Sequence, residues 1–539
     1  MIGPLMPKFQ GKHTRWCGVL PAMRKTLQTT RPREARHTAR AMADTSTPLF
    51  AFDNTYAREL PTAGLAWQPV PAPEPRWLWF NHALAAELDL DVQALAGDAG
   101  LAVFAGQLVP EGAQPVAQAY AGHQFGGFSP QLGDGRALLL GEVTDRHGQR
   151  RDIAFKGSGR TPFSRGGDGK AAIGPVLREV LIGEAMHALG IPTTRALAAV
   201  GTGEQIYRER PLPGAVLTRV AASHLRVGTL QFFAARRDTQ TLRRAAEYAI
   251  ARHDPDLVGR DDRFLQLLAA VVQRQARLVA QWMGMGFIHG VMNTDNMTLS
   301  GETIDYGPCA FMEAFDPQTV FSSIDTHGRY AFGNQPAMAH WNLARLAEAL
   351  LPLIDANPDQ AVLRATRVLD GFESHFNAHW LAVHRAKLGL EATGDDEADR
   401  ALVNDYLQGL HRHGVDFTLG FRRLADGLRG EPLALQLLWG EGVAELNAWT
   451  ARWRERLQAQ GRPEAEVARR MDAVNPLYIP RNHLVENALE AATENGDLRA
   501  FEKLLAIVTR PFDERPEDAR AAQPGTREQT QGYRTFCGT

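Results

Sequence analysis

The stretch HGVMNTDNM, residues 289–297, is followed by the tripeptide DYG at 305–307. Asn296 in the first and Asp305 in the second are nine positions apart, and both side chains offer the oxygen ligands that magnesium prefers. Residues 297–307 are predicted to form a short hairpin, which would bring both oxygens to one side of a phosphate site. A magnesium site is therefore expected here.

The same stretch matches the catalytic-loop pattern of protein kinases, H-R-D-x-x-x-x-N, which precedes D-F-G. His289 takes the histidine position and Asn296 the position of the metal-binding asparagine, but Val291 occupies the place of the catalytic aspartate. Asp295 stands beside Asn296, and a carboxylate near the metal is suited to accept a proton from a hydroxyl group. The alternative role for Asp295 is to cap the loop as a hydrogen-bond acceptor.

Upstream of this stretch, the predicted order of elements is strand, strand, helix, strand, strand. Apolar runs at 133–143 and 150–159 flank a polar turn and indicate a hairpin. Apolar residues at helical spacing predict a helix over 172–190. A second hairpin is predicted from strands at 204–209 and 214–221. A long helix with one apolar face then leads into the loop that carries HGVMNTDNM.

Two charged residues in this order of elements are candidates for nucleotide binding. Lys156 ends the second strand, and Glu179 lies on the helix that follows. In kinases a strand lysine contacts the nucleotide phosphates, and a helix glutamate holds that lysine. Taken alone, Lys156 and Glu179 would each be interpreted as an ordinary solvated charge. Their predicted pairing rests on their positions in the second strand and the first helix of this order of elements.

Two glycine-rich segments, 133–136 and 157–170, suit a close approach of backbone amides to an anion, although neither is a G-x-G-x-x-G loop. Basic side chains gather in and after them: Arg136, Arg160, Arg165, Lys170, Arg219 and Arg226. Arg219 lies in an apolar strand and requires an acid or an anion nearby. So much positive charge suggests that the polyphosphate is held and that the α-phosphorus reacts, so that a nucleotide is transferred.

The composition restricts the class of protein. With 539 residues and a net charge of -2, the chain gives no electrostatic reason to expect nucleic acid or an anionic membrane as a partner. No apolar run approaches the roughly 18 residues needed to span a bilayer. Cys17, Cys309 and Cys537 are too few for a disulfide framework or a zinc site, which fits a reducing compartment and favours the cytoplasm.

Five regions are predicted along the chain. Residues 1–43 are basic and aperiodic, and are predicted to be disordered; they are either an organelle-targeting leader, which we favour less, or the product of a start codon placed upstream of Met42. The others are a wrapping segment at 44–119 with a helical piece at 79–88, a small lobe at 120–225, the core of a large lobe at 226–355, and a mostly helical region at 356–539. Together they predict an α+β, protein-kinase-like two-lobe fold.

Several long motifs resemble the selenoprotein O (YdiU) family: YAGHQFGGFSPQLGDGRALLLGE, DIAFKGSGRTPFSRGGDGKAAIGPVLREVLIGEAMHALG, GFIHGVMNTDNM and DYGPCAF. The resemblance runs from about Phe50 to the C-terminus. It implies a kinase-like fold that binds ATP in a reversed orientation and transfers AMP to Ser, Thr or Tyr hydroxyls of proteins. UMP transfer from UTP is also attributed to bacterial members. Magnesium is the implied metal, with manganese as an alternative.

The resemblance also implies roles for single residues. The implied nucleotide contacts are Gly133, Gly135, Arg136, Lys156, Asp168, Gly169, Arg219, Arg226 and Asp305. Asp295 would accept the proton, Asn296 and Asp305 would bind magnesium, and Glu179 would hold Lys156. The resemblance assigns no role to Arg160 and Arg165.

Cys537, third from the end, matches the redox residue of the family. Some bacterial members pair it with a cysteine in the loop after D-Y-G, where this chain has Ser322 and Ser323. Cys309 is then the remaining candidate partner, and an unpaired terminal thiol is the alternative.

Two other functions remain open from the residues alone. One is a small-molecule kinase of the aminoglycoside-phosphotransferase type, against which the excess of arginine argues. The other is a catalytically silent scaffold that binds ATP. The expected partners are ATP or UTP and protein acceptors, without nucleic acid or membrane.

Overall fold

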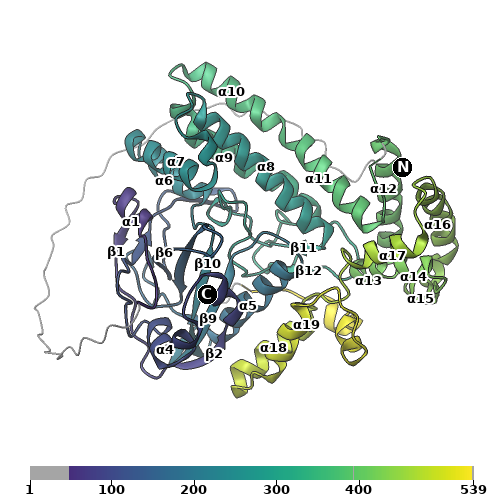
Figure 1. Cartoon of the computed structure of the whole chain (residues 1–539), viewed down its shortest axis with the longest axis horizontal. Helices are drawn as coiled ribbons and strands as arrows, with labels where there is room; N and C mark the ends of the chain where they lie inside the picture. The colour runs from purple at the N-terminus through teal and green to yellow at the C-terminus, as the bar shows by residue number, and fades with distance from the viewer. Residues whose placement is uncertain (1–47, 393, 537–539) are drawn as a thin grey trace, which may run out of the picture. The chain divides into compact units, whose positions relative to one another are not determined.

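A large antiparallel sheet carries the predicted small-lobe strands in the computed structural model, which describes residues 48–392 and 394–536 (Figure 1). Its strands lie in the order β1-β3-β6-β7-β10-β9-β2, with β8 beside β10. Their bounds are β1 Gly64–Ala66, β2 Arg76–Phe80, β3 Val116–Gln118, β6 Ala137–Thr144, β7 Arg150–Lys156, β8 Ala171–Ala172, β9 Arg195–Tyr207 and β10 Pro211–Ala221. Helices and antiparallel strands together make a mixed α/β structure.

The two predicted hairpins are present. β6 pairs with β7 around a turn in which Asp145 accepts hydrogen bonds from the backbone amides of His147 and Gln149. The first strand of the second hairpin, β9, is much longer than the predicted 204–209. Its added part, residues 195–203, is mostly buried and rich in alanine, and no element was predicted there from the sequence.

The segment before residue 120 supplies both edges of this sheet. β2 pairs with β9 at one edge, and β1 continues the other edge through β3 and β6. The helix predicted at 79–88 is wrong in its first part, because Trp79 belongs to β2 and helix α2, His82–Glu87, starts later. Asn81 separates the two elements, since its side chain accepts from the amide of Leu84 and caps the helix.

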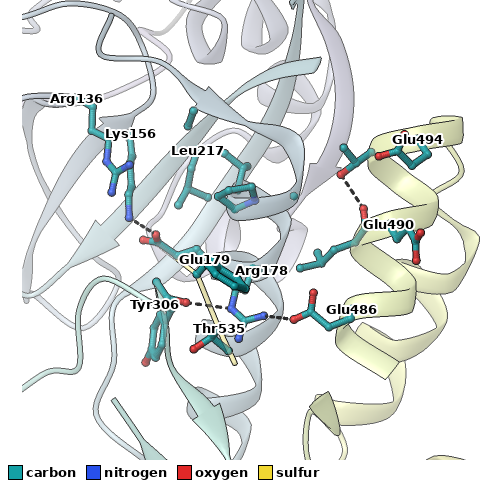
Figure 2. A pocket seen from close by; sticks show the side chains of 18 of the residues that line it. Arg136, Lys156, Arg178, Glu179, Leu217, Tyr306, Glu486, Glu490, Glu494 and Thr535 are labelled. Carbon is teal, nitrogen blue, oxygen red and sulfur yellow. Dashed lines mark hydrogen bonds and ion pairs between the residues drawn. The ribbon is translucent and has the colours of Figure 1, made fainter. Parts of the chain in front are cut away.

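The helix predicted at 172–190 is α5, Ile173–Ala188, and nearly every side of it is buried. One side packs on the sheet, and the other packs on two C-terminal helices, α18 (Asn482–Asn495) and α19 (Arg499–Val508). Enclosure from both sides fixes the direction of the Glu179 side chain, which points to the sheet (Figure 2).

The chain beyond the sheet is mostly helical. Helices α8 and α9 lie side by side, and α10 and α11 follow each other end to end along them (Figure 1); a group of shorter helices comes next. The bounds are α6 Val227–Ala235, α7 Thr239–His253, α8 Arg263–Gly284, α9 Gln335–Ile354, α10 Pro358–Asp370, α11 Phe372–Lys387, α12 Asp396–Arg412, α13 Phe417–Arg422, α14 Leu424–Leu428, α15 Leu433–Trp439, α16 Val443–Gln458 and α17 Glu464–Asp472. The prediction of a long helix before HGVMNTDNM is confirmed by α8. None of the helices in the described residues is long and apolar enough to cross a membrane.

The hairpin predicted over 297–307 is wrong. Thr298 makes an isolated bridge to Arg226, and Thr303 makes one to Thr193, so the backbones of both arms pair outward. The arms are joined by a side-chain contact, from Thr298 Oγ1 to the carbonyl of Glu302, and not by strand pairing. A short pair of strands, β11 (Phe287–Ile288) and β12 (Ala310–Phe311), flanks the region instead. The segment 1–43 and Cys537 lie outside the described residues.

Candidate active site

A cleft of about 750 Å³ opens where the glycine-rich segments face the loop that carries HGVMNTDNM. Most of the predicted site residues line it: Gly133, Gly135, Arg136, Asp168, Gly169, Asp295, Asn296 and Asp305. Val291, Asn293, Tyr120 and Gln124 line it as well. The structure therefore gathers in one cavity residues that are far apart in the sequence, such as Gln124 and Asp295, which are 171 positions apart and in contact.

Asp305, which lines the cleft, belongs to a cluster of four charged side chains, of which the other three are mostly buried. Lys156 Nζ lies 2.5 Å from Glu179 Oε2 (Figure 2) and also contacts Asp305 Oδ1. Arg219 donates from Nε to Glu179 at 2.7 Å and from Nη2 to Asp305 at 2.9 Å. Arg219, which was expected to need an acid in its apolar strand, therefore contacts two, Glu179 and Asp305. The predicted Lys156–Glu179 pair is also formed.

The cluster keeps its carboxylates ionised. Burial would raise the pKa of Asp305, but the charges of Lys156 and Arg219 outweigh it and hold that pKa well below its ordinary value. The pKa of Glu179 is lowered in the same way, with burial opposed by Arg219 and Lys156. The backbone of Asp305 has φ 70, a conformation that is rare for residues other than glycine and is often found at functional sites.

The side chain of Asn296 is held by a hydrogen bond within the loop that carries HGVMNTDNM. Val291 is buried, so an apolar side chain occupies the place of the kinase aspartate. The side-chain amide of Asn296 donates to the carbonyl of Val291 at 3.1 Å, which leaves its oxygen available as a ligand. No group of three His, Cys, Asp or Glu side chains suited to a metal occurs among the described residues. Asn296 and Asp305 both line the cleft, and both side chains carry oxygen atoms of the kind that bind magnesium.

Asp295 projects into the same cleft from the short helical turn Thr294–Asn296. Burial raises the pKa of its carboxyl group to about 6, although the positive charge of Arg226 and a hydrogen bond from Gln124 act in the opposite direction. Oδ2 accepts that bond at 3.3 Å, and Oδ1 has no hydrogen-bond partner within the described residues. Asp295 thus has one buried oxygen without a hydrogen-bond partner and a pKa of about 6, and a carboxylate with such a pKa can accept a proton near neutral pH.

The glycines of the two segments are needed for close packing. Gly133 has φ +89, and a Cβ there would lie 2.4 Å from the ring of Phe163. Gly169 has φ +69, and its Cβ would lie 2.1 Å from a backbone oxygen of Gly159. The glycine-rich segments therefore fold against each other and form a wall of the cleft. Asp168, beside Gly169, accepts two hydrogen bonds from Arg208 in that wall.

The other basic residues differ in their surroundings. Arg226 is buried, with its guanidinium 4.3 Å from the centre of the Tyr120 ring and 3.4 Å from Asp134. Arg160 donates to the carbonyls of Gly166 and Gly167, which makes it a support of the glycine-rich segment. Sequence reasoning did not find the cleft residues Tyr120, Gln124, Asn293 and Arg208, because their contacts depend on tertiary packing and no local spacing marks them.

A second cavity, of about 420 Å³, is lined by Lys156 and Glu179 (Figure 2) and shares Arg136 with the cleft. Helices α5 and α18 and residues 534–536 line the rest of it. Cys309 lies nearby and is buried, and burial raises the pKa of its thiol to about 11. Cys537, its candidate partner, is outside the described residues.

Comparison with known proteins gives one family. Residues 56–509 match the family model of the protein adenylyltransferase SelO. A protein nucleotidyltransferase YdiU of Chromobacterium violaceum is 60% identical over 478 residues, which cover 88% of this chain and 99% of the relative. YdiU proteins of Cereibacter sphaeroides and Rhizobium leguminosarum are 59% and 58% identical, each over 91% of this chain and over 100% and 97% of the relative. The chain therefore belongs to the protein adenylyltransferase SelO family.

Proposed function

We propose that the chain transfers AMP from ATP to Ser, Thr or Tyr hydroxyl groups of proteins and releases pyrophosphate, with UTP as an alternative donor of UMP. Membership in a protein adenylyltransferase family, with nucleotidyltransferase relatives of high identity, makes it a nucleotidyltransferase. The observation that carries the site assignment is the cleft itself, in which Asp295 faces the same cavity as Asn296 and Asp305.

The proposed nucleotide site runs along the cleft. Lys156, Arg219 and Arg226 would bind the phosphates, because charge-assisted hydrogen bonds from buried cations are strong. Arg136 lines the cleft beside them, and Gly133 and Gly135 allow backbone amides to approach an anion. Asp168 and Gly169 would contact the nucleoside, since they lie in the same wall.

Asn296 and Asp305 would hold Mg²⁺ or Mn²⁺. Such an ion neutralises charge on the phosphates of a bound nucleotide and orients them. The carboxylate of Asp305 stays ionised because of Lys156 and Arg219, so it can exchange one of these partners for a metal ion.

In the proposed reaction, the acceptor hydroxyl forms a bond to the α-phosphorus while the bond from that phosphorus to pyrophosphate breaks. The hydroxyl proton moves to the carboxylate of Asp295. The cations Lys156, Arg219 and Arg226 stabilise the negative charge that develops on the departing pyrophosphate. Glu179 acts through Lys156 and Arg219, whose side chains it holds.

We propose that the fold is of the protein-kinase type, with the lobe boundaries predicted from the sequence. The order β6, β7, α5, β9, β10 and the Lys156–Glu179 pair support this proposal. A cytoplasmic location is proposed from the small number of cysteines and from the bacterial relatives.

The function is tested by labelling. ATP labelled at the α-phosphate, with magnesium and a protein acceptor, should label the acceptor or the enzyme itself. Asp305→Asn should be silent, whereas Asp256→Asn, a change at an exposed aspartate that does not line the cleft, should keep full activity. Label that arrives only from the γ-phosphate would replace this proposal with a kinase. ATP-dependent stabilisation without transfer to any acceptor would replace it with a scaffold.

A further inference from the structure

The hairpin formed by β4 (Gly122–Gln124) and β5 (Gly127–Ser129) lies outside the large sheet and pairs only with itself among the described residues. Its two-residue turn, Phe125–Gly126, has positive φ at both positions, 51 and 89. Two positive φ values are typical of a type I′ turn, but phenylalanine is an unusual residue for such a turn. A strained residue at the tip is therefore held there by its surroundings.

Those surroundings are the loop that carries Asp295. Three successive residues of the hairpin bond to three successive residues of the loop. The amide of His123 donates to Thr294 Oγ1 at 2.7 Å, and the side chain of Gln124 donates to Asp295 Oδ2 at 3.3 Å. The amide of Phe125 donates to Asn293 Oδ1 at 3.1 Å, and this oxygen also accepts from the hydroxyl of Tyr330.

Gly122 lies next to the other oxygen of the Asp295 carboxylate, Oδ1, and has no side chain to fill the space there. A Cβ at this position would lie 2.5 Å from Asp295 Oδ1, closer than real Cβ contacts allow. Gly122 thus leaves the space that Oδ1 occupies, while the Gln124 amide holds Oδ2. The hairpin therefore donates a hydrogen bond to Oδ2 and leaves room for Oδ1, so that both oxygens border it.

We propose that Gln124 is a positioning residue for Asp295 and that the β4–β5 hairpin orients the proton acceptor toward the acceptor hydroxyl. This inference rests on the proposed function. One bond to Oδ2 leaves lone pairs of the carboxylate free, and Oδ1 has no partner within the described residues. A base must lie within hydrogen-bond reach of the hydroxyl whose proton it takes, so a restrained carboxylate favours reaction.

The test is Gln124→Met, measured by steady-state AMP transfer from α-labelled ATP to a protein acceptor that the unaltered enzyme labels. Methionine keeps the length and flexibility of glutamine but cannot donate the hydrogen bond. We expect kcat to fall by about tenfold to a hundredfold, the cost of misplacing a reacting group by up to about 1 Å. The KM for ATP and the unfolding temperature should change little, since Gln124 holds no nucleotide contact in this account.

Gln131→Met is the matched control, because Gln131 is exposed just after the hairpin and lies outside the cleft. Gly122→Ala disturbs the same carboxylate from its other oxygen and should give the same split between kcat and KM. Full kcat in Gln124→Met would overturn the inference, and so would a loss explained by a higher KM for ATP or a lower unfolding temperature. If the unaltered enzyme transfers no AMP, the proposed function fails and the inference with it. If the unaltered enzyme transfers AMP and Gln124→Met is fully active, the proposed function stands and only the positioning role of Gln124 is refuted.

Discussion

At the scale of residues, the inner end of the cleft depends on a balance of charge. Lys156 and Arg219 lie between the carboxylates of Glu179 and Asp305, and each cation contacts both acids. Buried cations of this kind are tolerated only because the acids are there. A nucleotide phosphate would add negative charge next to the same cations, so occupancy of the cleft and stability of the protein should be linked.

Glu179→Gln tests this linkage. The change leaves Lys156 and Arg219 with one carboxylate, and we expect the free energy of unfolding to fall by about 3 kcal/mol, as found when a buried ion pair loses one partner. ATP should recover more stability in this variant than in the unaltered protein, because its phosphates replace the missing charge. Urea unfolding with and without ATP measures both effects. Glu431→Gln, at an exposed position, is the control, and equal stability of Glu179→Gln and the control would contradict the expectation.

At the scale of elements, helix α11 ends in a lysine whose side chain is buried. Lys387 is buried, and its ammonium lies 4.4 Å from the ring centre of Phe421 and 5.5 Å from that of Phe417. No carboxylate acts on it among the described residues. Burial lowers its pKa from 10.5 to about 7. The cationic form is therefore disfavoured in the folded state.

Lys387 should make stability depend on pH. Because its pKa is lowered on folding, the unfolded chain binds more protons between pH 7 and 10.5, and stability should rise with pH across this window. The contribution of this group has a limiting slope of about 1.4 kcal/mol per pH unit. Lys387→Met should remove that part of the slope and raise the unfolding temperature at pH 7. Lys503→Met, at an exposed lysine, should change neither the slope of stability against pH nor the unfolding temperature at pH 7. An unchanged slope in Lys387→Met would show that the lysine stays charged.

Local sequence patterns predicted the strand and helix that carry the charged site residues, but they did not predict which other residues line the cleft. Lys156 and Glu179 were identified because a strand end and a helix have recognisable periodicity, and their contact follows from the order of elements. Asn296 and Asp305 were expected on one side of a phosphate site; both line one cleft, although the hairpin that was predicted to bring them together does not form. The contact of Gln124 with Asp295 joins positions 124 and 295, and no local signal specifies such a pairing.

At the scale of the whole molecule, the C-terminal helices belong to the core that supports the site. Helix α5, which bears Glu179, packs its outer side on α18 and α19, and Phe501 of α19 is fully buried in that cluster. The edges of the large sheet come from the segment before residue 120. Both ends of the described chain therefore hold the central elements in place, although the sequence suggested only a wrapping segment and an extension.

Phe501→Ala tests this dependence. Removing a buried aromatic ring leaves a cavity and should lower the free energy of unfolding by about 3–5 kcal/mol. AMP transfer should decline at temperatures where the unaltered protein is stable, since α5 loses its outer support. Leu437→Ala, at a leucine that is 74% exposed, should have little effect in either assay. A neutral result for Phe501→Ala would mean that α19 is dispensable for α5.

The central claim is that the α-phosphorus of the nucleotide, and not the γ-phosphorus, reacts in this cleft. Intact-mass spectrometry of the acceptor and the enzyme after incubation with ATP and magnesium tests it most directly, because added AMP and added phosphate differ greatly in mass. The account predicts an increase equal to one or more AMP groups, which is absent in Asp305→Asn. An increase equal to phosphate, or an AMP adduct that persists in Asp305→Asn, would contradict it.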